Sequence, residues 1–230
     1  FSELNDKIYY SIINKIFKIL ELFRNNKQEV KISSYNKIYI DKTRQRISNI
    51  TNSHILKLFK YDCINVNGKV LNNWKNIEKN IFAKIDELYN EEDNCFIHGD
   101  LCLSNILYDL RSGIVRLIDP RGVWGDNENG DIKYDVAKLR HSISGNYDYI
   151  VNDLFTIEIQ ENKIVYKTYD SNNSNIKEYF DEQISKYYNL NQIKLIEGLL
   201  FLSMIPLHKE NSQRQLIMYV KAIEILNEVL

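Results

Sequence analysis

Residues 96–107 read FIHGDLCLSNIL, and residues 117–119 read Leu-Ile-Asp. The carboxylate of Asp100 is followed five residues later by the amide of Asn105, and a second carboxylate, Asp119, ends the next apolar segment. Phosphoryl transfer needs one group to orient the attacking hydroxyl and accept its proton, and oxygen ligands to hold Mg²⁺ against nucleotide phosphates. Asn105 and Asp119 supply the oxygen ligands that Mg²⁺ prefers, so the spacing favours this chemistry.

The segment between these groups predicts a β-hairpin. Residues 106–108 and 114–118 are mostly apolar, and residues 109–113 between them end in a glycine. A hairpin returns the chain, so both magnesium ligands are expected at one end of a strand pair. Six of the eight glycines fall between residues 95 and 146, which marks this stretch as the irregular part of the molecule.

The flanking sequence predicts regular structure around this segment. Apolar residues recur at helical spacing over residues 8–23 and 74–88, and more weakly over 34–48. Residues 65–68 predict a turn, residues 155–166 predict a second hairpin, and further helices are expected at 131–142, 176–188, 192–204 and 212–229. We therefore expect one mainly helical α+β domain over 1–230, with a helical part (1–94), a catalytic and metal-binding segment (95–146), and a hairpin plus C-terminal helices (147–230).

Composition limits the possible partners. Thirty basic and 31 acidic residues give a net charge of −1, which argues against binding nucleic acid or a membrane surface by bulk electrostatics. Three cysteines without metal-ligand spacing favour neither a disulfide framework nor a zinc site, and they fit a reducing, cytoplasmic compartment. The longest apolar run, residues 199–207, is too short to span a bilayer, so no membrane insertion is expected.

A third motif extends the pattern. Residues 130–137 read GDIKYDVA, which predicts a helix that begins with a Gly-Asp pair and carries Asp135 in its first turn. Together, the HGD-x4-N loop, the Ile-Asp after a hairpin and the GD-x3-D helix start resemble the aminoglycoside phosphotransferase and choline kinase family, which is kinase-like. Each motif alone is short, but the three occur in order and within the predicted loop, hairpin and helix.

The resemblance implies a role for each matching residue. Asp100 would be the catalytic base, and Asn105 and Asp119 would hold Mg²⁺ and, through it, ATP as the phosphoryl donor. His98 and Asp135 would support the catalytic loop, Asp135 by hydrogen bonds and His98 by packing beneath it. Asp131 fits either a functional role or a helix N-cap that accepts a backbone N–H.

A narrower resemblance points to the acceptor. The sequence LIDPRG at 117–122, the run at 133–139 and the Gly-Asn-Tyr at 145–147 are similar to a branch found in bacterial capsule and surface-polysaccharide gene products. This likeness favours a sugar-type hydroxyl acceptor, with choline or an aminoglycoside as alternatives. A catalytically inactive interaction or regulatory module and a metal-dependent hydrolase are the other function classes that we consider.

The chain departs from the family upstream of His98. Complete members carry a strand-rich N-terminal lobe with a phosphate-covering loop and a lysine–glutamate pair, whereas residues 1–94 contain no Gly-rich loop, and Lys42 lacks a strand context. The resemblance therefore covers the C-terminal lobe of a kinase-like fold. Because the chain begins with Phe1, we expect a missing N-terminal lobe or adjacent domain as its partner, and an inactive enzyme when the fragment is isolated.

Four residues are candidates for contacting the substrate. Arg121 follows the metal-binding segment and would contact a phosphate or form a surface salt bridge. Trp124 would stack on a sugar or pack in the core. His208 and Arg214 belong to a polar cluster after Pro206, which forms either a pocket wall or a solvated helix cap. We expect Cys102, inside the catalytic loop, to be a packing residue, because no base neighbours it in the sequence.

Overall fold

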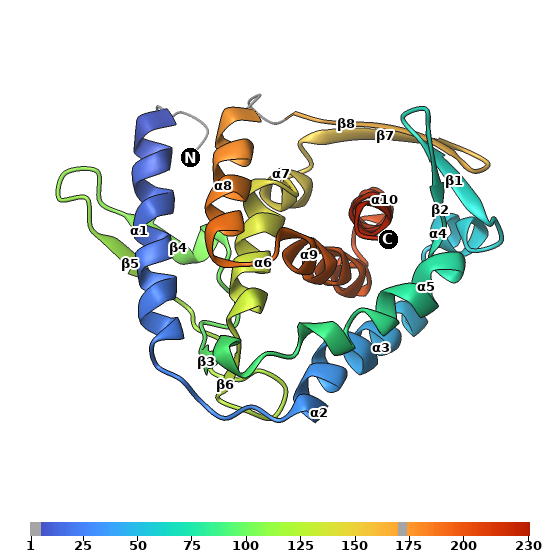
Figure 1. The fold of residues 1–230 in the computed structure, drawn as a ribbon. Helices are drawn as coiled ribbons and strands as arrows, with labels where there is room; N and C mark the ends of the chain where they lie inside the picture. Colours follow the sequence, from blue (N-terminus) through green and yellow to red (C-terminus); the bar gives the residue numbers. More distant parts are fainter. Residues whose placement is uncertain (1–5, 170–173) are drawn as a thin grey trace.

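The computed structural model describes residues 6–169 and 174–230, and its fold is α+β and mainly helical (Figure 1). The α-helices are, in chain order, α1 (Asp6–Arg24), α2 (Ile32–Tyr35), α3 (Lys42–Ser48), α4 (Ser53–Leu58), α5 (Trp74–Ala83), α6 (Ile132–Ile143), α7 (Tyr147–Val151), α8 (Ser174–Tyr187), α9 (Leu190–Met204) and α10 (Ser212–Glu228). The π-helical segment η1 (Asn36–Asp41) joins α2 to α3, and short 3-10 turns are η2 (Asp86–Leu88), η3 (Glu91–Asp93), η4 (Leu103–Asn105) and η5 (Ile205–Leu207).

The long helices form because their apolar residues repeat on one face. In α1, Ile12, Ile16 and Leu20 are each 1% exposed, whereas the opposite face is polar. Helices α1, α6 and α8 pack against one another on one side of the molecule, and α9 packs between α6 and α10 (Figure 1). The helices predicted at both ends of the chain are therefore present, with bounds within a few residues of those expected.

Helix α9 is apolar on nearly all sides. Among the described residues, one stretch, Leu190–Leu207, is long and apolar enough to cross a membrane, and 67% of it is buried inside the fold. Ten residues of α9 itself are buried. An all-round apolar helix that neighbouring helices cover is the pattern of a core helix.

Two short strand pairs frame the central segment. Strand β4 (Ile106–Tyr108) pairs with β5 (Val115–Leu117) in the predicted hairpin, with Ile106 opposite Leu117. Strand β3 (Asn94–Phe96) pairs with β6 (Asn129–Asp131), also antiparallel, and this pair sets Cys95 opposite Gly130. The second pair brings the segment before the HGD sequence next to the start of α6.

A four-stranded sheet corrects the expectation of only two hairpins. The predicted turn at 65–68 connects β1 (Cys63–Val66) to β2 (Lys69–Asn72), so residues 1–94 are not helical throughout. Strand β1 also pairs in parallel with β8 (Lys163–Thr168), which pairs with β7 (Phe155–Gln160) to give the order β2-β1-β8-β7. A four-residue strand carries little periodic signal, and its partner lies about a hundred positions away, so the sequence pattern did not indicate the pairing.

Candidate active site

The start of α6 is held directly behind the HGD loop. Strand β3 leads into this loop, and its partner β6 ends at Asp131, which caps α6 by accepting a hydrogen bond from the Lys133 backbone N–H (3.0 Å). The Asp131 side chain is fully buried, and it also accepts a hydrogen bond from the Tyr39 hydroxyl (3.0 Å). Of the two roles considered for Asp131, the structure has the N-cap.

Asp135 fixes the shape of the loop. Its Oδ2 atom accepts a hydrogen bond from the His98 backbone N–H (2.6 Å), and its Oδ1 atom accepts one from the Gly99 backbone N–H (2.9 Å). Burial raises the pKa of Asp135 to about 7, although the two donors favour the ionised form. These are the hydrogen bonds expected of a residue that supports the catalytic loop.

His98 joins the loop to the hairpin. The imidazole is 2% exposed; its Nε2 atom lies 2.9 Å from the Ile118 carbonyl oxygen, and its Nδ1 atom accepts a hydrogen bond from the Asp100 backbone N–H (3.3 Å). This pairing places the proton on Nε2, because a carbonyl oxygen only accepts. His98 therefore links the backbone of Asp100 to that of Ile118, the residue directly before Asp119.

Gly99 is required by the backbone at this point. Its φ is +78°, and a Cβ atom there would lie 3.1 Å from the Cβ of Arg121. A left-handed residue in such a tight position favours glycine. The middle residue of the HGD sequence is thus explained by local geometry.

Asp100 lies at the surface of the loop and pairs with a buried lysine. The Nζ atom of Lys138 is 2.7 Å from Asp100 Oδ1, and the two side chains are 9% and 34% exposed. Burial alone would raise the pKa of Asp100, but the positive charges of Lys138 and Arg121 outweigh burial and hold that pKa below its ordinary value. The pair therefore favours the ionised form of Asp100.

The role of Lys138 was not predicted from the sequence. Lys138 lies on α6 three residues after Asp135, so the two side chains share one face of the helix. Asp135 contacts the backbone of the loop, and Lys138 contacts the Asp100 carboxylate. The three-residue spacing between Asp135 and Lys138 was the sequence signal that could have indicated this contact, because Asp135 was already expected to support the loop.

Asn105 and Asp119 lie on adjoining backbone segments. The Asn105 Nδ2 atom donates to the Asp100 carbonyl oxygen (2.8 Å), so Oδ1 is the atom of this amide that could bind a metal ion. The Ile118 backbone N–H donates to the Asn105 carbonyl oxygen (3.0 Å). Asp119 is exposed, with a φ of +55°. Left-handed backbone in a non-glycine residue is uncommon and concentrates at functional sites.

This donor set suits Mg²⁺ only together with a nucleotide. Within 6–169 and 174–230, no group of three or more His, Cys, Asp or Glu side chains is placed to hold a metal ion. Magnesium in phosphotransferases is usually bound through one or two carboxylates and substrate phosphates, with waters completing the shell. One amide oxygen and one carboxylate fit that chemistry.

Comparisons with known proteins leave the family open. No family model, no curated protein and no solved structure matches the chain. The likeness to kinase-like phosphotransferases therefore rests on the three motifs and on the contacts described above.

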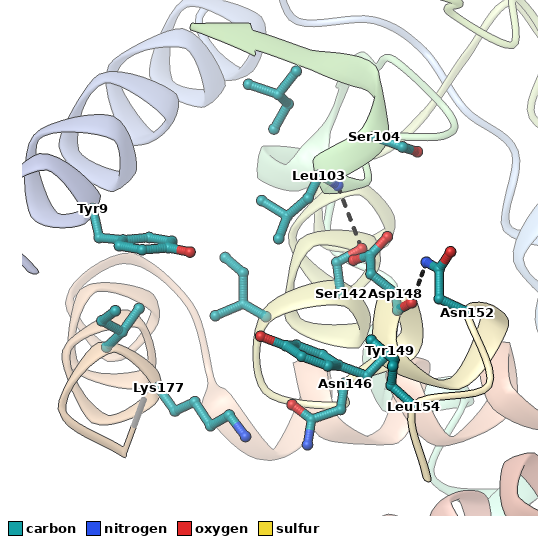
Figure 2. A pocket seen from close by; sticks show the side chains of 13 residues that line it. Tyr9, Leu103, Ser104, Ser142, Asn146, Asp148, Tyr149, Asn152, Leu154 and Lys177 are labelled. Atoms are coloured by element: carbon teal, nitrogen blue, oxygen red, sulfur yellow. Dashed lines mark hydrogen bonds between the residues drawn. The ribbon is translucent and has the colours of Figure 1, made fainter. Parts of the chain in front are cut away.

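A cavity of about 460 Å³ opens beside the catalytic loop. Leu103 and Ser104 of η4 form one wall, Ser142 and Asp148 of the α6–α7 corner form another, and Tyr9 of α1 lies across from them (Figure 2). The Ser142 hydroxyl accepts a hydrogen bond from the Leu103 backbone N–H (3.4 Å), so the cavity wall is tied to the loop. This cavity was not predictable from the sequence pattern, because elements distant in sequence form it.

The four candidate substrate residues do not gather at one site. Trp124 is 2% exposed and packs edge-on against Tyr35 and Tyr134, so the assignment to a substrate site is corrected: the indole belongs to the core. Arg121 is exposed, and its backbone N–H donates to the His98 carbonyl oxygen (2.8 Å) beside the loop.

The other two candidates, His208 directly after η5 and Arg214 in the first turn of α10, are not among the residues that line the cavity. Arg214 pairs with Asp153 (2.7 Å) and Glu210 (3.2 Å) in an exposed cluster, as expected of a solvated helix cap. His208 is half-buried; its Nε2 atom lies 3.3 Å from the Tyr147 hydroxyl, which ties it to α7. Neither residue lines the cavity.

Gly130, the first residue of the GD motif, leaves no room for a side chain. A Cβ atom there would lie 2.7 Å from Ile97 and from the Trp124 ring. We expect Gly130→Ala to lower the free energy of unfolding by about 1–3 kcal/mol, the usual cost of overpacking a core. Urea denaturation measures the change. Glu128→Ala, on an exposed neighbour, is the control, and an equal effect in both variants would contradict this account.

Proposed function

We propose that this chain is the catalytic lobe of a small-molecule phosphotransferase, which moves the γ-phosphoryl group of ATP to a hydroxyl of a small acceptor. The observation that carries the proposal is the loop around Asp100, with its partly exposed carboxylate, its supporting Asp135 and the adjoining Asn105 and Asp119 backbone. Phosphoryl transfer relies on positioning and electrostatic stabilisation, which such a loop supplies.

Each residue has a definite task in this proposal. Asp100 orients the acceptor hydroxyl and takes its proton, while Lys138 keeps the carboxylate ionised and fixes one of its oxygens. Asn105 and Asp119 would hold Mg²⁺, which neutralises charge on the phosphates when it is bound. His98 and Asp135 position the loop through their hydrogen bonds to its backbone and to the hairpin.

A sugar or a surface-polysaccharide precursor is the acceptor that we favour, because of the likeness to bacterial capsule gene products at residues 117–122 and 133–139. Choline and aminoglycosides are the alternatives within the same family. Cytoplasmic ATP would be the donor.

Magnesium dependence gives the direct test. We expect the full-length protein to transfer phosphate from ATP to an acceptor in a panel of sugars, choline and aminoglycosides. EDTA should abolish the transfer and excess Mg²⁺ should restore it, because the bound ion would neutralise charge on the phosphates during transfer. Radiolabelled ATP and product chromatography measure it, with calcium as the control metal.

An inactive kinase-like module is the second candidate. It is favoured by the lack of a Gly-rich phosphate loop anywhere upstream of His98 in the sequence. If the full-length protein folds but transfers phosphate to no acceptor in the panel, the catalytic proposal fails and the inactive module becomes the better interpretation.

A further inference from the structure

A second cavity, of about 640 Å³, opens between the helical segment 33–45 and the turn at Gly125 and Asp126. The segment that leads into this turn packs on the HGD loop. A Cβ atom at Gly99 would lie 3.1 Å from the Cβ of Arg121 and 3.7 Å from the Val123 carbonyl oxygen. The backbone that contacts the HGD loop therefore continues, two residues later, into the wall of this cavity.

Lys42 is a half-buried cation in the lining of the second cavity. Its Nζ atom donates a hydrogen bond to the Tyr134 hydroxyl (3.3 Å) and lies 5.6 Å from the centroid of the same ring. Within the described part of the chain, no carboxylate forms an ion pair with this ammonium group. Removing a charge from water costs free energy unless a counter-charge compensates it. An anionic ligand in the cavity would supply that counter-charge.

Lys42 and Asp100 both contact side chains of α6. Lys42 donates to Tyr134, and Asp100 forms its ion pair with Lys138, with 2.7 Å between Nζ and Oδ1. Tyr134 and Lys138 are four residues apart, which is ~6 Å along a helix axis. A ligand that reaches both Asp100 and Lys42 therefore has to extend about one helix turn, a span that a monosaccharide with one charged substituent covers.

The charges around Lys42 leave a positive excess. Arg46, one turn further along α3, is half-buried, and among the described residues its guanidinium has no hydrogen bond, ion pair or ring contact. Like charges at this spacing destabilise a helix. In the cavity lining, Lys37 and Asp126 pair with each other, and Asp41 is exposed and forms no ion pair within the described ranges. Lys42 and Arg46 thus outnumber the one carboxylate that is not already paired.

We infer that the acceptor carries an anionic group, a phosphate or a carboxylate, which Lys42 binds in the second cavity while the acceptor hydroxyl lies at Asp100. That the bound molecule is the acceptor rests on the proposed function, whereas binding of the anion does not depend on turnover. A cationic acceptor such as choline or an aminoglycoside would meet a like charge at Lys42.

Calorimetry without ATP tests the charge preference. Glucose, glucose-6-phosphate and glucuronate are titrated into the full-length protein, so that the three probes differ mainly in the substituent on one carbon atom. At least one anionic probe should bind about tenfold or more tightly than glucose, because it gains a charge-assisted hydrogen bond. The difference should shrink as NaCl is added, since salt screens partly exposed charges. Comparison of the two anions distinguishes a phosphate from a carboxylate.

Variants of Lys42 test the assigned residue. Lys42→Met keeps a long stem against Tyr134 but loses the charge, and it should weaken binding of the anionic probe roughly tenfold to hundredfold. Lys42→Arg keeps the charge and should retain most of the affinity. Lys57→Met removes an exposed lysine of α4, outside the cavity lining, and should bind like the wild type.

Circular dichroism shows whether Lys42→Met is folded, and Lys42→Arg tests the role of the charge if it is not. Equal binding of glucose and both anionic probes, no binding of either anionic probe, or equal affinities in wild type and folded Lys42→Met would overturn the inference. Loss of binding in Lys42→Arg as large as that in Lys42→Met would also overturn it, because the positive charge would then not be the cause.

The outcomes separate the two proposals. If phosphate is transferred to a neutral acceptor and Lys42→Met leaves the KM for that acceptor unchanged, the anion site fails while the proposed function stands. If an anionic probe binds in a manner that depends on Lys42 but no phosphate is transferred to any acceptor, the proposed function fails and the anion site stands.

Discussion

Replacing Asp100 with asparagine is expected to reduce kcat by about 10²- to 10⁴-fold, the usual contribution of a positioned general base. Asparagine has almost the same shape, so the loop should keep its hydrogen bonds to Asp135 and the carboxamide of Asn105 should keep its contact with the Asp100 backbone. The amide cannot take a proton from the acceptor hydroxyl. The loss should therefore fall on kcat, with little change in the KM for ATP.

Steady-state kinetics of the full-length protein measure this effect. Asp86→Asn is the matched control, because Asp86 is an exposed aspartate in η2, outside the catalytic loop and the cavity lining. Circular dichroism and urea denaturation show whether Asp100→Asn is folded. A folded Asp100→Asn variant with near-normal kcat would rule out Asp100 as the base and, with it, the proposed mechanism.

The local elements were predictable because their signals are local. The hairpin at 106–117 follows from two apolar segments around a glycine-containing turn, and α6 follows from its apolar stripe and the Asp131 cap. The resemblance carried by the three motifs likewise implied that Asp135 would support the HGD loop, and Asp135 accepts hydrogen bonds from the backbone of that loop. The hairpin and the helix concern residues whose neighbours are set by a turn or by helical spacing, whereas the contact of Asp135 with residues 36 and 37 positions away followed only from the resemblance.

Features built from distant segments were not predictable in this way. The parallel pairing of β1 with β8 joins residues about a hundred positions apart, and the cavity combines α1, η4, α7 and α8. Trp124 illustrates the same limit. Its burial depends on Tyr35 and Tyr39, which approach it only in the folded chain, so the sequence alone left core and substrate roles open.

Lys138 was also missed, and its replacement gives the second large expected effect. Lys138→Met keeps a long, apolar stem in the buried position but removes the ammonium group 2.7 Å from Asp100. Without that partner, the Asp100 carboxylate loses both orientation and charge stabilisation. We expect kcat to fall about tenfold to hundredfold at neutral pH, somewhat less than the loss from removing a donor that contacts the reacting atoms.

The pH dependence distinguishes this role from a merely structural one. Burial raises the pKa of Asp100, and in the wild type the positive charge of Lys138 overcomes burial and lowers it. Removing the charge therefore raises the pKa, so less of the base is ionised at a given acidic pH. The acidic limb of the kcat profile should move to higher pH in Lys138→Met, and Lys138→Arg should move it back towards the wild type.

Two controls make the measurement decisive. Lys79→Met, on an exposed position of α5, should leave both kcat and the acidic limb unchanged. Thermal unfolding of Lys138→Met separates a loss of folded protein from a loss of turnover per molecule. If kcat falls while the acidic limb stays where it is in the wild type, Lys138 supports the fold at α6 but does not tune the base; if neither changes, the pair has no part in turnover.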